Sequence, residues 1–238
     1  MKALMFSPGA DTKWLQNYFP HVNPYLLKIA NKPLLEYFID FCVLQHISEI
    51  RLVTGHHDTE LEAYFGDGDK WGVELTYGLA KPKDTMKRVM LKNAAFCRNS
   101  ELLIFYGYFF LHYNKNEPKY PFIINEAKDR SIGDDNSSLI ILSTREEQEW
   151  RVVIPLEFDK LKLTSLESVR TYYRISMSIL KEESSQYVLP GYSNEEGVFI
   201  GRNVTYPMSM FPEKPLMFGD NVQLKDNTSI GPNTILGD

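Results

Sequence analysis

The chain has 238 residues, of which 43% are hydrophobic and 24% are charged, a globular composition that excludes a disordered, collagen-like or fibrous protein. Its 26 lysines and arginines and 31 acidic residues give a net charge of -5, without the basic excess of a protein that binds nucleic acid. No run approaches the roughly 18 apolar residues that cross a bilayer, and the start lacks the pattern of a signal peptide. We therefore expect a cytoplasmic protein with neither a membrane span nor a nucleic acid partner. Cys42 and Cys97 lie far apart, which predicts buried thiols rather than a disulfide framework or a zinc site.

The first 110 residues alternate short aliphatic runs with amphipathic stretches, a pattern typical of a parallel sheet covered by helices. Strands are expected at four apolar runs, residues 2–6, 50–54, 73–77 and 102–106. Helices are expected to begin at capping residues, namely Asn31, Asp58, and Asp84 or Thr85. The fourth strand is a continuous apolar run, which predicts that both of its faces are buried.

Beyond residue 110 the pattern is less regular. Strands are expected over residues 139–143 and 151–154, and a helix over residues 166–180. Residues 114–138 are rich in polar residues and proline, which indicates a loop. Residues 181–197 contain acidic pairs, proline and glycine, and are interpreted as a linker.

The tail has a different period, because large apolar residues recur every six positions. They are Phe218, Leu224, Ile230 and Leu236, in phase with Ile200. This pattern resembles the hexapeptide repeat of left-handed parallel β-helices, in which three hexapeptides make one coil. A hairpin with Gly-Asp-Asn and Gly-Pro-Asn turns is the alternative, but three consecutive hexapeptides in phase favour the β-helix.

A β-helix buries its apolar residues by stacking coils, so its terminal coil needs a cover. The sequence ends two residues after a repeat start, without a polar cap. We expect this end to be covered by later residues of a longer protein or by another subunit, which predicts a homo-oligomer or a partner subunit bound through the β-helix.

Three segments of the first 110 residues match one enzyme family nearly letter for letter. They are residues 29–37 (Ile-Ala-Asn-Lys-Pro-Leu-Leu-Glu-Tyr), 49–55 and 62–73. The chain thereby resembles the sugar-1-phosphate nucleotidyltransferases, or NDP-sugar pyrophosphorylases, many of which carry a C-terminal β-helix. The resemblance implies a Rossmann-like (GT-A-like) α/β nucleotidyltransferase domain over residues 1–190, with a shortened sugar-binding part, and the start of a left-handed β-helix over residues 191–238. It also implies attack of a sugar-1-phosphate on the α-phosphorus of a nucleoside triphosphate, with release of pyrophosphate.

The family's glycine-rich loop after the first strand uses backbone N–H groups to hold the triphosphate. At the matching positions Gly9 and Thr12 are kept, and Lys13 keeps a positive charge. Pro8 has no N–H to donate, and Asp11 places a carboxylate where phosphates should lie. Two changes in this loop therefore work against anion binding.

The family's signature lysine, which supports the phosphates during transfer, falls on Pro24. The two aspartates that hold the bridging magnesium ion fall on Tyr108 and Lys162. A neutral phenol and an ammonium group cannot supply an anionic metal site, so we expect no metal cofactor and no catalytic residue. The family's nucleobase-reading turn falls on residues 84–87 (Asp-Thr-Met-Lys) and has lost its glycines. Here Lys87 and Arg88 join Gly9, Thr12 and Lys13 as candidates for residual nucleotide binding.

The segments that build the fold match the family closely, whereas the glycine-rich loop, the signature lysine, the pair of aspartates and the nucleobase-reading turn do not. This contrast favours a protein that has kept the fold of the family but not its nucleotidyl transfer activity. We expect a pseudoenzyme of nucleotide-sugar or surface-polysaccharide metabolism that acts as a regulatory, ligand-sensing or scaffolding module, with a nucleotide or nucleotide-sugar as ligand. Two alternatives stay open. One is a working magnesium-dependent sugar-1-phosphate nucleotidyltransferase that uses displaced residues, and the other is the N-terminal module of a longer enzyme.

Overall fold

The structure is a computed structural model. It describes residues 1–6, 12–55, 58–81, 83–98, 100–117, 137–143, 151–153, 161–195, 197–207 and 213–237. The strands in these residues are β1 (Lys2–Phe6), β2 (Lys28–Ile29), β3 (Lys32–Pro33), β4 (Glu49–Thr54), β5 (Glu74–Leu79), β6 (Glu101–Gly107), β7 (Phe109–His112), β8 (Ser137–Ser143), β9 (Arg151–Val153), β10 (Lys162–Ser165), β11 (Tyr192–Glu195), β12 (Val198–Ile200), β13 (Leu216–Phe218) and β14 (Thr234–Leu236). The α-helices are α1 (Lys13–Tyr18), α2 (Leu34–Leu44), α3 (Thr59–Phe65), α4 (Met86–Lys92), α5 (Ala94–Cys97) and α6 (Val169–Ser178). Short helical turns are η1 (Pro24–Leu26), η2 (Asp69–Trp71), η4 (Ile179–Glu183, a π-helix) and η5 (Ser184–Gln186).

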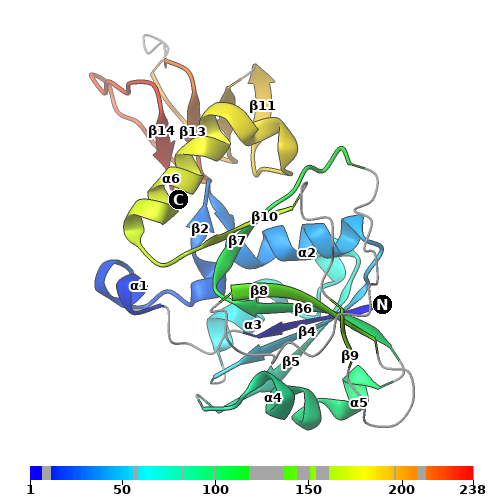
Figure 1. The fold of residues 1–238 in the computed structure, drawn as a ribbon. Helices are drawn as coiled ribbons and strands as arrows, with labels where there is room; N and C mark the ends of the chain where they lie inside the picture. Colours follow the sequence, from blue (N-terminus) through cyan, green and yellow to red (C-terminus); the bar gives the residue numbers. More distant parts are fainter. Residues whose placement is uncertain are drawn as a thin grey trace.

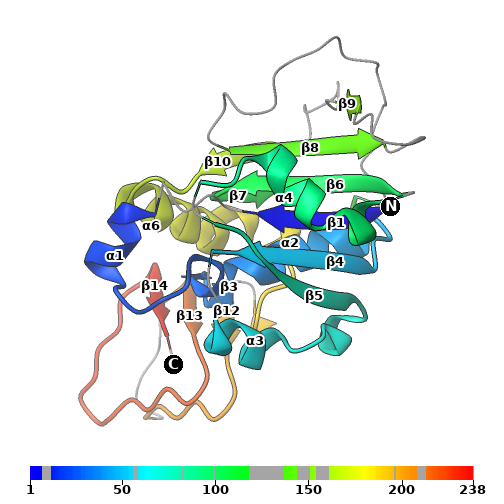
Figure 2. The same cartoon turned by 90° about the horizontal axis from the view of Figure 1, so that it is seen from below.

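The central sheet has the strand order β5-β4-β1-β6-β8-β9, and its first four strands are parallel. The chain builds outward from β1 through β4 to β5, and then returns to the other side of β1 to form β6 (Figure 2). Ligands of open α/β sheets bind at such a reversal, beyond the carboxyl ends of the strands. The predicted Rossmann-like α/β class and its parallel sheet are confirmed.

The strands β1, β4 and β6 contribute to two hydrophobic cores, because successive side chains point to opposite faces of the sheet. In β1, Ala3 and Met5 pack in the core that includes α2 and α3, whereas Leu4 and Phe6 pack in the core that includes α4 and α5. Figure 1 shows α2 on one side of the sheet and α4 with α5 on the other. The predicted burial of both faces is confirmed for β6, because Leu103 and Phe105 pack in the first core and Leu102 and Ile104 in the second.

Two of the three predicted helix starts are confirmed by side-chain capping. The Asp58 carboxylate accepts a hydrogen bond from the Leu61 N–H at 2.9 Å, and the Thr85 hydroxyl accepts one from the Arg88 N–H at 3.4 Å. The predicted helix after residue 85 is divided at Asn93 into α4 and α5. No helix in the described part of the chain is long and apolar enough to cross a membrane.

The predicted helix start at Asn31 is wrong, because α2 begins at Leu34. Ala30 and Asn31 have φ angles of 48° and 58° and form the two-residue turn between β2 and β3, a geometry that suits the twist of a hairpin. The Asn31 side chain instead donates a hydrogen bond to the Leu236 carbonyl at 2.8 Å. Its amide therefore connects this hairpin to the tail.

The helix expected over residues 166–180 is confirmed as α6 and η4, whereas the loop expected over residues 114–138 lies mostly outside the described residues. The interpretation of residues 181–197 as a linker is wrong. Tyr187 in that segment is buried, with its ring centroid 5.5 Å from that of Tyr37 and 5.7 Å from that of Phe110. This segment is therefore part of the main core.

The tail stacks strands at a fixed separation of 18 residues. β12, β13 and β14 are parallel, with Val198 opposite Leu216 and Leu216 opposite Thr234. Eighteen residues equal three hexapeptides, which agrees with the predicted repeat, and the left-handed coil stays a prediction. The Met217 side chain is fully buried in the main core, so the tail packs directly on the α/β domain.

Candidate functional site

The sheet topology places the candidate site beyond the carboxyl ends of β1 and β6. Gly107, the last residue of β6, has a φ of 96°, a conformation that glycine adopts at no steric penalty. Tyr108 follows it and is only 1% exposed. Its hydroxyl donates a hydrogen bond to the Pro24 carbonyl at 3.0 Å. The structure thus brings together two candidate residues that are 84 positions apart in the sequence.

The contact between Tyr108 and Pro24 is a neutral one. Burial raises the pKa of the Tyr108 phenol well above its usual value, and the neighbouring Tyr25 and Tyr172 add to this shift. The hydroxyl therefore keeps its proton and its role as a donor. Pro24 contributes only a carbonyl acceptor to this contact, so neither position carries the charge that phosphoryl chemistry requires.

The segment just after β10 also closes on Tyr108. The Leu166 N–H donates a hydrogen bond to the Tyr108 carbonyl at 3.1 Å, and the Trp14 indole donates one to the Leu166 carbonyl at 2.6 Å. Trp14 belongs to α1, which lies beside α6 in both views of the fold (Figures 1 and 2). The Trp14 ring also lies 6.2 Å from that of Tyr172 in α6. Trp14, Leu166 and Tyr172 therefore pack on the segment that contains Tyr108.

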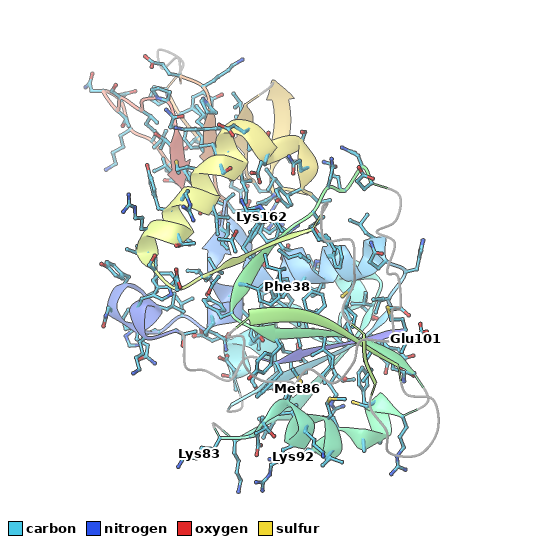
Figure 3. All side chains as sticks on the ribbon, viewed as in Figure 1. Phe38, Lys83, Met86, Lys92, Glu101 and Lys162 are labelled. Carbon is cyan, nitrogen blue, oxygen red and sulfur yellow. The ribbon has the colours of Figure 1, made fainter. Side chains whose placement is uncertain are left out.

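Lys162 is the first residue of β10 and lies away from Tyr108 along the strand. In the antiparallel pair of β10 with β7 it lies opposite His112, and the pairing runs from there to Ser165 opposite Phe109. At about 3.3 Å per residue, Lys162 is roughly 13 Å along the strand from Leu166, the residue that bonds to Tyr108. Its exposed side chain lies near α6, far from α4 (Figure 3). The correspondence of Lys162 to the second aspartate stays a prediction, and an exposed ammonium group at this position supplies no metal ligand.

These positions do not fit the magnesium ion that the resemblance implies. Mg²⁺ is bound through carboxylate and other oxygen acceptors in octahedral geometry. The Tyr108 hydroxyl uses its proton in a buried hydrogen bond, and Lys162 is a cation on the surface. Among the residues that the structure describes, no three histidines, cysteines or acidic residues gather as metal ligands.

The candidate phosphate-binding loop is only partly described, because Gly9 and Asp11 lie outside the described residues. Thr12 is 7% exposed, and its carbonyl accepts the first backbone hydrogen bond of α1 from the Leu15 N–H at 2.9 Å. Lys13, the first residue of α1, is exposed. Lys13 is therefore the candidate of this loop that presents a positive charge to solvent.

The predicted base-reading turn is organised around the buried carboxylate of Asp84. It accepts a hydrogen bond from the Lys81 N–H at 2.7 Å, forms an ion pair with Lys92, and lies 3.2 Å from the Arg88 guanidinium. The hydrogen bond from Lys92 is the main cause that holds the pKa of Asp84 below its usual value. Lys87 and Arg88 are both exposed, but Arg88 is paired with Asp84.

An open depression of about 630 Å³ lies on the tail, away from Tyr108. Its lining includes Tyr192, Arg202 and Asp220, and the last two form an ion pair at 2.6 Å. Because their charges compensate each other, this depression offers no surplus charge for a phosphate or a cation.

With the site's geometry described, comparison with known proteins identifies the family. The sequence pattern of the family described as nucleotidyl transferase matches residues 20–157, which is more than half of the chain. The chain belongs to the nucleotidyl transferase family. Its matching region includes the positions of Pro24 and Tyr108.

Two curated proteins are similar to this nucleotidyl transferase domain. A low-salt glycan biosynthesis nucleotidyltransferase of Haloferax volcanii is 35% identical over 79 residues, which are 32% of this chain and 22% of that protein. A glucose-1-phosphate thymidylyltransferase of Streptomyces antibioticus is 32% identical over 77 residues, which are 32% of this chain and 21% of that protein. The matched part thus spans about a fifth of the length of each relative.

Two solved structures are also similar in part. A Bacillus anthracis protein described as a glucose-1-phosphate thymidylyltransferase, in complex with sucrose, aligns with a TM-score of 0.44 and 15% identity over 79% of this chain and 78% of its own. A UDP-glucose pyrophosphorylase in complex with UDP-glucose aligns with a TM-score of 0.41 and 17% identity over 50% of this chain and 49% of its own.

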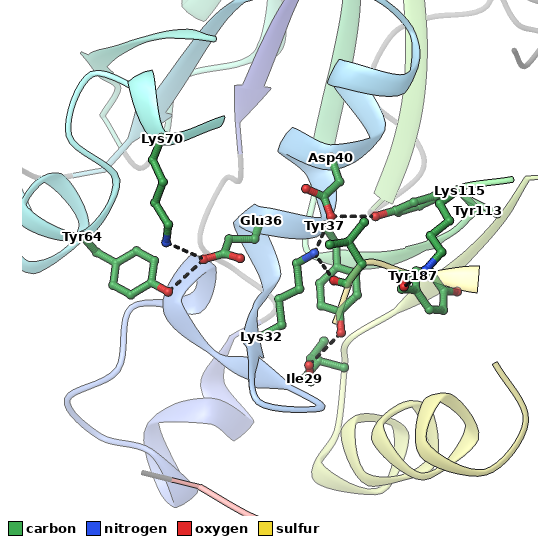
Figure 4. Close-up of polar contacts among 11 residues, drawn as sticks. Ile29, Lys32, Glu36, Tyr37, Asp40, Tyr64, Lys70, Tyr113, Lys115 and Tyr187 are labelled. Carbon is green, nitrogen blue, oxygen red and sulfur yellow. Dashed lines mark hydrogen bonds and ion pairs between the residues drawn. The ribbon is translucent and has the colours of Figure 1, made fainter. Parts of the chain in front are cut away.

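Within the family-like segment of residues 29–37, the structure reveals a buried ion pair that the sequence analysis missed. Lys32 is only 3% exposed and pairs with Asp40 of α2, and its ammonium lies 4.8 Å from the centre of the Tyr37 ring (Figure 4). The same ammonium donates a hydrogen bond to the Val188 carbonyl, 156 residues away. Lys32 therefore has a structural role in this nucleotidyl transferase domain, and its spacing in the sequence gave no signal of these partners.

Proposed function

We propose that this member of the nucleotidyl transferase family is non-catalytic and acts as a regulatory, ligand-sensing or scaffolding module. The observation that carries the proposal is the hydrogen bond between the buried Tyr108 hydroxyl and the Pro24 carbonyl. The resemblance implies a metal-binding carboxylate at position 108 and a phosphate-binding ammonium group at position 24. Both positions instead hold neutral groups, which form a hydrogen bond with each other. Removing a single group that stabilises transition-state charge lowers turnover by roughly 10² to 10³-fold, so the two losses leave no practical activity even if they are not additive.

The proposed setting is nucleotide-sugar or surface-polysaccharide metabolism. The names of the two curated relatives refer to glycan biosynthesis and to glucose-1-phosphate. The proposed ligand is a nucleotide or nucleotide-sugar that binds without magnesium. The exposed ammonium groups of Lys13 and Lys87, next to the former phosphate-binding and base-reading segments, support this choice because they can contact phosphate oxygens.

The test combines a pyrophosphate-release assay with calorimetric titration of nucleoside triphosphates, sugar-1-phosphates and nucleotide-sugars, with and without magnesium. We expect no pyrophosphate from any common substrate pair. A ligand sensor should bind a nucleotide-sugar without metal, and the binding should weaken in Lys13→Ala but not in the surface control Lys225→Ala. A scaffold should bind none of these ligands. Sustained magnesium-dependent pyrophosphate release that is lost in Lys13→Ala would overturn the proposal and favour the enzyme.

We also propose that the tail is the start of a left-handed β-helix through which the protein self-associates. The 18-residue register of β12 to β14 supports the first part. In the described sheet β14 is an edge strand, and an unpaired strand edge readily pairs with another chain. Light scattering after size-exclusion chromatography should give a mass above that of the monomer, and a strict monomer at every concentration would contradict this. Deleting the tail is an unsuitable test, because it would also uncover the main core around Met217.

A further inference from the structure

We propose that the outer surface of α4 and α5 docks on an anionic lipid bilayer; this goes beyond the proposed function and does not depend on it. Residues 81–98 contain six lysines and arginines and one acidic residue, in a chain whose net charge is -5. The six cations are exposed and together form what we call the basic face: Lys81, Lys83, Lys87, Arg88, Lys92 and Arg98.

The orientation of α4 follows from the spacing of its apolar residues. Met86, Val89 and Met90 are buried in the core under the sheet, so Lys87 and the other polar residues of this helix point outward. Figure 1 shows α4 and α5 as the outermost layer on this side of the sheet. Figure 3 shows Lys83 and Lys92 on the outer side of that layer, with Met86 between α4 and the sheet.

Most of the positive charge of the basic face is uncompensated. Its one acidic residue, Asp84, has a side chain that is only 2% exposed and is already surrounded by Arg88 and Lys92. Among the described residues, no carboxylate lies within ion-pair distance of the other four cations of the face. The face therefore presents a positive surface on a protein whose overall charge is negative.

Exposed leucines favour a bilayer over other anionic partners. Leu91 is 57% exposed and lies four positions after Lys87 and three after Arg88, so helical geometry places it among the cations. Leu79, at the end of the edge strand β5, is 59% exposed. Basic residues that attract anionic headgroups, combined with apolar side chains that enter the headgroup boundary, are typical of surfaces that lie on membranes. Nucleic acid offers phosphates without an apolar layer, and an acidic protein surface lacks the continuous apolar layer that lies directly beneath the anionic headgroups of a bilayer.

The test is co-sedimentation of the full chain with vesicles of phosphatidylserine in phosphatidylcholine, and with vesicles of pure phosphatidylcholine. Near an anionic surface each lysine or arginine strengthens binding roughly fivefold. We expect binding only to the anionic vesicles, with release at high salt. The variant Lys83→Ala/Lys87→Ala should weaken the binding at least tenfold, and Leu91→Ser should weaken it while leaving the charge unchanged.

The control variant Lys181→Ala/Lys225→Ala removes the same charge from exposed positions elsewhere, and should bind almost as the unmodified chain does. All five substituted side chains are exposed, so thermal melting should be the same for every variant. Equal weakening in the two double variants, no binding to the anionic vesicles, or tighter binding to RNA or to an acidic protein would each overturn the proposal.

Discussion

Removing the Tyr108 hydroxyl tests whether this side chain stabilises the fold as part of the structural core. In Tyr108→Phe the ring keeps its packing, but the Pro24 carbonyl loses its donor at 3.0 Å. An acceptor left unsatisfied in a buried place costs about 1–3 kcal/mol. Because Pro24 is only partly buried, water can reach its carbonyl in part, so we expect a loss of about 1–2 kcal/mol. For a chain of this size each kcal/mol lowers the melting temperature by roughly 2–4 °C.

The assay is urea unfolding followed by circular dichroism, with Tyr77→Phe as the matched control. The Tyr77 hydroxyl also donates to a backbone carbonyl, that of Gly66, at 2.8 Å, but this contact is exposed. We expect Tyr77→Phe to change stability by no more than about 0.5 kcal/mol. Equal losses in the two variants would refute the conclusion that the hydrogen bond of Tyr108 has a special structural role.

Tyr108→Asp gives the functional arm of the same experiment. The substitution places a carboxylate at a position that is 1% exposed, next to a carbonyl rather than a cation. We expect a larger loss of stability than in Tyr108→Phe, and no magnesium-dependent release of pyrophosphate, because one carboxylate does not make a metal site. Recovered turnover in this variant would show that the rest of the catalytic site is intact.

Three further substitutions test the packing of other regions. Lys32→Met leaves the largely buried carboxylate of Asp40 without its counter-charge, so it should lower the free energy of unfolding by about 3 kcal/mol. A loss below about 1 kcal/mol would show that the ion pair contributes little to stability. A Cβ at residue 201 would lie 2.5 Å from the backbone of Gly219, so Gly201→Ala should cost about 1–3 kcal/mol. The control Gly231→Ala, whose Cβ would have no neighbour within 4 Å, should melt as the unmodified chain does. A hydrogen bond from His112 is the main cause that holds the pKa of Glu183 below its usual 4.5. The resulting stability is present above pH 4.5 and lost as the pH falls through the lowered pKa. Glu183→Gln should therefore flatten the acid side of the stability profile, and an unchanged acid side would contradict this assignment.

Local pattern in the sequence determined most of the secondary structure. Hydrophobic alternation predicts the central strands, and Asp58 and Thr85 cap helices as expected, because these features depend on neighbouring residues. The six-residue period likewise predicts the 18-residue register of the tail strands. The resemblance to a known family drew attention to Pro24 and Tyr108 as positions without the expected charges.

Only the tertiary structure decided what those positions do. The bond of Tyr108 to Pro24, the contact of Asn31 with Leu236, and the burial of Lys32 all join segments that are distant in the sequence. Such contacts follow from how elements pack, which no local period encodes. For the same reason the sequence did not predict that Lys162 lies opposite His112, since the register between β7 and β10 is fixed by the packing of both strands rather than by either segment alone.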